Sequence, residues 1–249
     1  MKTESKLTLV CVVIGLFTAF STYSAETKPK YGPEATQVST SHQYFLSHAA
    51  PDFWVIAPYY VPQQDGRSCS LASVTMIVNA ARAHQRLTAD DELATQPEVL
   101  KKTALDDWKT DLGAIGKGVT LDELGRFSEG ALRGYGITPS EVQTLHVNQT
   151  PESRKKVHEL LVRNEGSDRN FIIANFIQGS YTGDADVGHI APVGAYDAQK
   201  KYVLIMDPDR QWYEPYWVSE ETFVDGMATQ DKTSTKTRGL IFIQLPPAK

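Results

Sequence analysis

A cysteine at the start of a predicted helix is the residue of this chain best suited to nucleophilic chemistry. Cys69 stands directly before residues 70–83, where apolar side chains recur at intervals of three and four, as on one face of a buried helix. The dipole and free N–H groups of such a helix end favour a thiolate over a thiol. The same N–H groups, with the side-chain amide of Gln63, could hold a developing oxyanion, and Arg67 could add positive charge.

Acyl transfer by a thiolate also needs a general base and a group that orients this base. His189 is the best candidate base, because it follows a glycine-rich loop (residues 179–188) and opens a predicted strand. Asp207 ends the next predicted strand, and a five-residue turn brings the two strand ends side by side. The carboxylate of Asp207 could therefore orient the imidazole. The other histidines lie in the polar N-terminal segment or near helices expected to be solvated: His42, His48, His84, His146 and His158.

Each of these residues also has an ordinary structural explanation. Cys69 could be a small buried apolar residue, and His189 could be structural. Asp207 precedes Pro208 and could serve only a turn. The order of glutamine, helix cysteine, glycine–histidine on a strand and aspartate at the hairpin end favours a catalytic site over these separate explanations.

The pattern along the chain predicts helices first and antiparallel strands afterwards, which is an α+β fold in one domain. Helices are expected at 70–83, from a capping box at Thr120 to Gly134 or Gly136, and at 151–163. Strands are expected at 171–177, 189–196, 202–207 and 239–245.

Composition excludes several function classes. The 249 residues are 41% hydrophobic and 22% charged, as in globular proteins. The formal net charge is -5, and no basic stripe suggests a nucleic-acid partner. Two cysteines exclude a disulfide-rich scaffold and a cysteine-based zinc ribbon, so no metal site is predicted.

The first 25 residues have the pattern of a secretory signal peptide. Two lysines precede an apolar run at 7–20 and small or polar residues at 21–25. The run is short for a membrane span, although an uncleaved anchor helix is the alternative. We expect a periplasmic or secreted chain, free of the membrane after cleavage, with Cys69 as its single cysteine. Residues 26–43 are polar and proline-containing and are expected to form an extended or mobile lead-in to a catalytic domain at 44–249.

Three segments resemble those of papain-like thiol enzymes. They are Gln63–Ser73, Gly188–Tyr196 and Val203–Trp217, the last containing Asp-x-x-Arg and Tyr-x-Pro-x-Trp. Within that superfamily the chain is most similar to the phytochelatin synthases, especially their short bacterial forms, over about residues 44–242. The resemblance implies a papain-like fold, with the nucleophile at a helix N-terminus and an antiparallel sheet in the C-terminal half.

The resemblance also implies the substrate, glutathione, and the roles of the residues. Cys69 would cleave the bond before glycine and carry a γ-glutamylcysteinyl thioester. His189 would take the thiol proton and return it to the departing amine, while Asp207 orients the imidazole. Gln63 and the backbone N–H of Cys69 would hold the oxyanion. Water would then release γ-glutamylcysteine, or a second glutathione would accept the acyl group to start a phytochelatin.

Other residues are expected at the substrate site or depart from the family pattern. Arg210 would line the site or brace its loop, and Gly188 would contact substrate. Gln178 and Trp212 stand where the family often has arginine and lysine. Losing these two cations would weaken the site for a second, anionic glutathione, so hydrolysis would outrun chain building.

No tightly bound cofactor is expected, and a homodimer is one possible assembly. The chain lacks a cysteine-rich C-terminal region, so a soft metal ion such as Cd or Zn would arrive as a glutathione thiolate complex. Two alternatives stay open at this point: a bacteriocin-type cysteine peptidase that cuts double-glycine leaders, and a thiol or metal–glutathione binding protein without activity.

Overall fold

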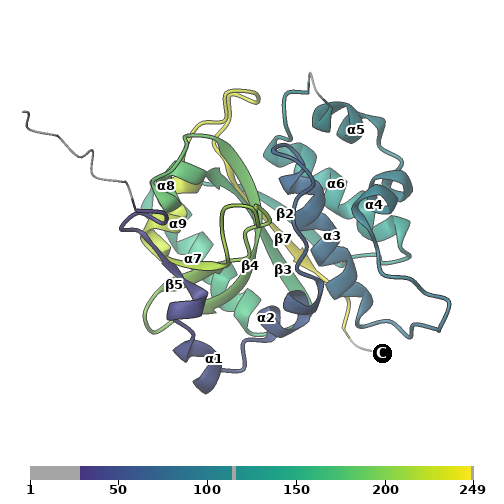
Figure 1. Cartoon of the computed structure of the whole chain (residues 1–249), viewed down its shortest axis with the longest axis horizontal. Helices are drawn as coiled ribbons and strands as arrows, with labels where there is room; N and C mark the ends of the chain where they lie inside the picture. The colour runs from purple at the N-terminus through teal and green to yellow at the C-terminus, as the bar shows by residue number, and fades with distance from the viewer. Residues whose placement is uncertain (1–28, 114–115, 248–249) are drawn as a thin grey trace, which may run out of the picture.

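The computed structural model describes residues 29–113 and 116–247, and the expected signal peptide lies outside them. A helical half packs against a half built around a sheet (Figure 1). The predicted α+β class is therefore confirmed. Within the described residues, no helix combines the length and the apolar character that crossing a membrane requires.

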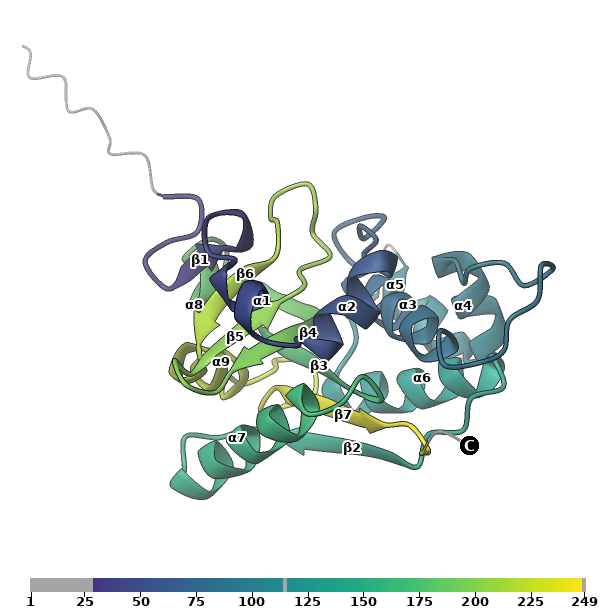
Figure 2. The ribbon, with the colours of Figure 1, turned by 90° about the horizontal axis from the view of Figure 1, so that it is seen from below.

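The helical half is built around α3 (Cys69–Arg82), whose residues from Ser70 onward are all buried. Such a helix needs partners on every side, because its polar and apolar faces are equally removed from water. It packs against α2, α4, α6 and strand β4. The helices of this half are α2 (Pro51–Ile56), α3, α4 (Gln96–Thr103), α5 (Asp106–Leu112) and α6 (Leu121–Gly134), with the 3-10 turn η2 (Ala57–Tyr59). Helix α1 (Gln43–Ser47) and the 3-10 turn η1 (Val38–Thr40) precede them and lie beside β6 (Tyr216–Ser219) (Figure 2).

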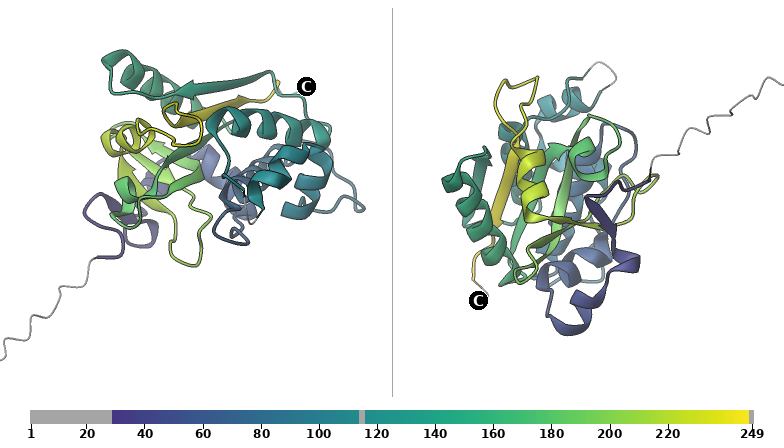
Figure 3. Two further views of the ribbon diagram at one scale, coloured as in Figure 1. Left: turned by 90° about the horizontal axis from the view of Figure 1, so that it is seen from above. Right: turned by 90° about the vertical axis from the view of Figure 1, so that its left-hand side faces the viewer.

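Within the part of the chain that the structure describes, the sheet has seven strands in the order β1-β6-β5-β4-β3-β7-β2, and every adjacent pair is antiparallel. Helix α7 lies at the side of the sheet away from α4 and α5 (Figure 3). The elements are β1 (Ala35–Gln37), β2 (Glu141–His146), α7 (Pro151–Glu165), β3 (Asn170–Ile177), α8 (Gln178–Thr182), β4 (Gly188–Asp197), β5 (Tyr202–Ile205), β6 (Tyr216–Ser219), α9 (Glu220–Met227) and β7 (Gly239–Gln244).

The central strands are apolar on both faces because both faces are covered. In β3, Phe171 and Ile173 belong to the core shared with α3, whereas Ile172, Ala174 and Phe176 belong to the core shared with α7 and α9. Successive side chains of a strand point to opposite faces. Burial on both sides therefore turns the expected alternation into the continuous apolar run that the sequence shows.

Most predicted elements occur where the sequence placed them. Helices α3, α6 and α7 and strands β3, β4, β5 and β7 match their expected ranges, with β5 ending two residues early, at Ile205. The Thr120 side chain accepts from the backbone N–H of Glu123 and the Glu123 side chain accepts in return, so the predicted capping box is confirmed.

The structure adds detail to one expectation and corrects another. The lead-in was expected to be extended or mobile, and its residues 35–37 are extended and pair with β6 as an edge strand. A polar sequence is sufficient there because an edge strand is stabilised by backbone hydrogen bonds to its neighbour. His146 was expected near a helix, but it lies in β2. Because the sequence of this strand mixes polar and apolar residues, its pairing with β7 was not predicted.

A carboxyl group is buried between α2 and α7. Asp52 has no exposed surface, and one of its oxygens accepts a hydrogen bond from the side-chain amide of Asn164. The other Asp52 oxygen and the Asn164 oxygen have no partner among the described residues. Burial, then the carboxylates of Glu165 and Asp168, raise the pKa of Asp52 well above its usual value, and the Asn164 bond offsets only part of this. A proton on Asp52 would remove the buried negative charge and leave a hydroxyl that can donate.

We predict that the free energy of unfolding falls as pH rises above about 4, the ordinary aspartate pKa, because unfolded Asp52 releases a proton that the folded carboxyl retains. Asp52→Asn mimics the protonated carboxyl and should reduce this loss between pH 5 and pH 8, measured by urea unfolding. Asp52→Ala, the control, should destabilise at both values. Identical pH dependence of wild type and Asp52→Asn would contradict the assignment.

Candidate active site

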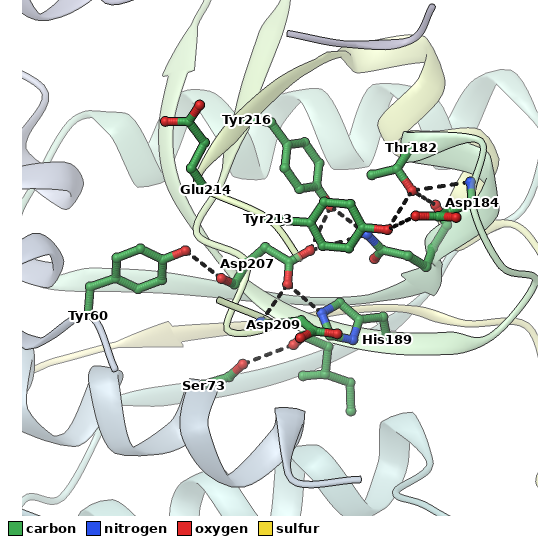
Figure 4. A network of polar contacts seen from close by, with 12 residues as sticks. Tyr60, Ser73, Thr182, Asp184, His189, Asp207, Asp209, Tyr213, Glu214 and Tyr216 are labelled. Carbon is green, nitrogen blue, oxygen red and sulfur yellow. Dashed lines mark hydrogen bonds and ion pairs between the residues drawn. The ribbon is translucent and has the colours of Figure 1, made fainter. Parts of the chain in front are cut away.

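Cys69 and His189 line one cavity of about 400 Å³ between the helical half and the sheet. Cys69 is the first residue of α3 and His189 is the second residue of β4. The hydroxyl of Ser73, one turn further along α3, donates to the backbone oxygen of Ile190 at 3.0 Å and fixes the two elements together (Figure 4). A thiol on a helix therefore faces an imidazole on the sheet, the arrangement expected of a papain-like enzyme.

The imidazole of His189 is held by Asp207. The His189 Nε2 atom lies 2.7 Å from Asp207 Oδ1, so Nδ1 is the ring nitrogen left to face Cys69. The His189 ring packs edge-on against Phe176, and 7% of the His189 surface is exposed. Burial opposes a charge on the ring, but Asp207, and after it Cys69, outweigh burial and raise the pKa of His189 well above its ordinary value. The geometry favours an imidazolium beside the sulfur.

Asp207 is fully buried and still ionised, because several donors converge on it (Figure 4). Oδ1 accepts from His189 and from the backbone N–H of Asp209 at 2.8 Å. Oδ2 accepts from the Tyr216 hydroxyl at 2.9 Å and from the Gln178 amide at 3.3 Å. Burial alone would raise the pKa of Asp207, but His189 and these hydrogen bonds lower it below the usual value.

Tyr216 and Tyr60 belong to this network and were not singled out from the sequence. Tyr60 donates to the backbone oxygen of Asp207. Tyr216 lies within the Tyr-x-Pro-x-Trp motif, which was the available signal for its role. Gln178 was identified only as a departure from the family; it is buried and points to Asp207 and Tyr216, away from the cavity.

Two expected site residues lie at the loop after Asp207. The backbone N–H of Gln63 donates to Pro208 O at 2.8 Å, and its side chain does not line the cavity. The amide's part in the oxyanion site therefore stays a prediction. Arg210 is exposed and lies outside the cavity lining, with its guanidinium 4.3 Å from the Tyr60 ring centre. This contact favours bracing of the loop, and contact between Arg210 and substrate stays a prediction.

Gly188 lines the cavity and makes room for Arg238, and its contact with substrate stays a prediction. A Cβ atom at position 188 would lie 2.8 Å from the Arg238 guanidinium. That guanidinium is 2.9 Å from Asn175 Oδ1 and 4.0 Å from Asp231. Burial lowers the pKa of Arg238, and Asp231 and Cys69 partly restore it, so the group stays charged. No local motif in the sequence pointed to Arg238.

The cavity wall carries an excess of positive charge. Four cationic side chains and two carboxylates line it in addition to His189: Arg67, Lys117, Lys232 and Arg238, with Asp186 and Asp231. Arg67, which was expected to add charge near Cys69, donates to Gly113 O at 2.7 Å. Such a wall suits a substrate that carries more negative than positive charge. Across residues 29–113 and 116–247, no group of three or more His, Cys, Asp or Glu side chains could hold a metal ion.

Comparison with known proteins identifies the family of this chain. The phytochelatin synthase model matches residues 34–240. The chain belongs to the phytochelatin synthase family. It is 25% identical over 201 residues to glutathione gamma-glutamylcysteinyltransferase 3 of Lotus japonicus (77% of this chain, 37% of the relative). It is 24% identical over 198 residues to glutathione gamma-glutamylcysteinyltransferase 1 of Triticum aestivum (77% and 35%).

This phytochelatin synthase family member therefore spans little more than a third of the length of these two relatives. Among solved structures, the avirulence protein AvrPphB of Pseudomonas is similar over 77% of this chain and all of that chain, at 10% identity and a TM-score of 0.38. The family resemblance drawn from the sequence motifs is confirmed.

We predict that iodoacetamide labels Cys69 rapidly near neutral pH, because a charged imidazole adjoins the sulfur. An unactivated thiol reacts only as pH approaches about 8.5. Asp207→Asn should move the rate profile up by about one pH unit, since the imidazolium loses its carboxylate. The measurement is the rate of label appearing on the peptide that contains residue 69.

Asp197→Asn is the matched control, because this carboxylate lies at the other end of β4 and accepts from the backbone N–H groups of Gln199 and Lys200 rather than from the imidazole. It should leave the labelling profile close to that of wild type. Equal labelling profiles for wild type and Asp207→Asn would show that Asp207 does not support the charge on His189.

Proposed function

We propose that this chain cleaves glutathione at the bond before its glycine and carries the γ-glutamylcysteinyl group on Cys69 as a thioester. One observation carries the proposal: the thiol, the buried His189–Asp207 pair and an excess of cationic side chains meet at one cavity. The name of the two relatives, glutathione gamma-glutamylcysteinyltransferase, describes the same acyl group.

The first half-reaction forms the thioester and releases glycine. The Cys69 thiolate attacks the carbonyl carbon of the cysteinyl–glycine bond, and the electron pair of the breaking C–N bond leaves on nitrogen. His189, charged at this stage, gives its proton to the departing amine. Asp207 stays ionised throughout and keeps the ring in place. The first-turn N–H groups of α3 have no partner within the helix and face the oxyanion, with Gln63 proposed as the second donor.

The second half-reaction returns the thiolate. Neutral His189 takes a proton from water, which attacks the thioester and releases γ-glutamylcysteine, or from the amine of a second glutathione, which extends the chain. We propose water as the main route. The Gln178 amide donates a hydrogen bond to Asp207 and offers no charge to an acceptor glutathione. Trp212 is an exposed ring, 55% accessible, with the Lys30 ammonium group over its face.

The cavity fits the ionic groups of glutathione, which has two carboxylates and one ammonium group. Arg238 offers a planar fork for one carboxylate, and Lys232 offers a cation for the other, because Lys117 is already paired with Glu123 at 2.7 Å. Asp231 or Asp186 suits the ammonium group. A metal ion would enter as a thiolate complex of the substrate. Export to the periplasm or medium rests on the N-terminal sequence alone, and a homodimer remains a prediction.

We predict that protein soaked in glutathione carries an adduct of glutathione minus glycine on Cys69, detected by mass spectrometry of the intact chain. Cys69→Ser should carry no thioester and show no turnover. An adduct of whole glutathione that a reductant removes would be a mixed disulfide and would contradict the acyl-enzyme. Cleavage of a double-glycine leader peptide without turnover of glutathione would favour the peptidase. Glutathione binding without turnover in both proteins would favour a binding protein.

We predict that Gly188→Ala raises KM for glutathione about tenfold while kcat changes little, because the new methyl group displaces the Arg238 guanidinium from its place. Steady-state kinetics of glycine release measures both constants. Gly166→Ala is the control: at the end of α7 the added methyl meets only ordinary contacts, at 3.4 Å or more. A Gly188→Ala enzyme with unchanged KM would exclude Arg238 from substrate binding.

A further inference from the structure

Residues 30–41, here called the N-terminal strap, lie along the segment that follows Asp207. Gln37 pairs with Tyr216 where β1 joins β6, at the edge of the sheet (Figure 2). The backbone N–H of Val38 donates to Pro215 O at 2.9 Å. The indole N–H of Trp217 donates to Ser41 O at 2.9 Å. The strap thus contacts residues 212–218 along most of its length.

Tyr31 is the residue of the strap that reaches inward. It is 9% exposed, and its ring meets Tyr213 and Tyr216 edge-on, with centroid distances of 5.7 Å and 5.9 Å. Its hydroxyl accepts from the backbone N–H of Glu214 at 2.9 Å. Edge-to-face aromatic contacts of this kind have a preferred geometry, so Tyr31 limits where its two partners can lie.

Tyr216 transmits this constraint to the catalytic residues. Its ring is fully buried between Tyr31 and Tyr213, and its hydroxyl donates to Asp207 at 2.9 Å. A buried carboxylate depends on each donor, because water cannot replace one that moves away. A shift of Tyr216 would therefore weaken the hold of Asp207 on His189.

We infer that Tyr31 is a positioning residue, which acts through Tyr216 and Asp207 to keep the His189 imidazole in place beside Cys69. No residue of the strap lines the cavity, and the contacts of Tyr31 are with Tyr213, Glu214 and Tyr216. We therefore expect its effect on the thiol to pass through these residues. The charged groups that act on the imidazole are Asp207, Cys69 and, from the same loop, Asp209. The inference rests on the thiol chemistry of the proposed function but not on glutathione as the substrate.

The test measures the rate at which iodoacetamide labels Cys69 as a function of pH, together with the melting temperature. Tyr31→Ala should move the rate profile up by about 0.5–1 pH unit, a change of up to about tenfold in the labelling rate at neutral pH. Tyr31→Phe keeps the ring contacts and should restore a profile near that of wild type. If Tyr31→Ala fails to fold, Tyr31→Leu, which fills most of the space without an aromatic edge, takes its place.

A double-mutant cycle tests the route. Tyr216→Phe removes the hydroxyl from Asp207 and should shift the profile in the same direction as Tyr31→Ala. Adding Tyr31→Ala to Tyr216→Phe should give no further shift, because both changes act on one chain of contacts. Tyr135→Ala, which removes a ring at the end of α6, is the control for lost stability alone and should leave the labelling profile unchanged.

An unshifted profile for Tyr31→Ala, or shifts that add fully in the double variant, would overturn the inference. Wild-type protein that labels only near pH 8.5 would overturn the activated thiolate and this inference with it. Wild-type protein that labels near neutral pH but does not turn over glutathione would contradict only the substrate. The labelling rates of the Tyr31 variants would still test the role of Tyr31 in that case.

Discussion

The buried hydrogen-bonded pair of His189 and Asp207 is the interaction on which the rest of the site depends. Two groups with 7% and 0% exposure are charged together only because each stabilises the other and donors surround the carboxylate. Removing either partner would leave one buried charge uncompensated, which costs several kcal/mol (roughly 3–5). The fold therefore has to supply a carboxylate, its donors and the thiol at fixed places before any substrate arrives.

The architecture meets this requirement by joining two rigid elements. Helix α3 is buried along its length and presents Cys69 from its first turn. Strand β4 is buried from His189 onward and lies in the middle of the sheet. Because both elements are packed on all sides, the distance between sulfur and imidazole is set by the core rather than by mobile loops. The loops contribute the cationic groups around the cavity.

Local patterns made much of this predictable. The apolar period of α3, the capping box at Thr120 and the hairpin that brings Asp207 back to His189 are short-range signals, and each matches the structure. The residues that escaped prediction depend on contacts between distant segments. Arg238 has no local motif, and the 35–37 strand is fixed by pairing with residues 216–218, far away in the sequence. Arg210 carried a motif, but its contact with Tyr60 could not be predicted from spacing.

The most direct test of the central claim is the charge of His189 at neutral pH, read from the ¹⁵N chemical shifts of its imidazole by NMR. We expect an imidazolium at pH 7, with both ring nitrogens protonated. The ring should lose its proton only well above the ordinary histidine pKa of about 6.5. A neutral His189 ring at pH 7 in the wild-type protein would contradict the thiolate–imidazolium pair.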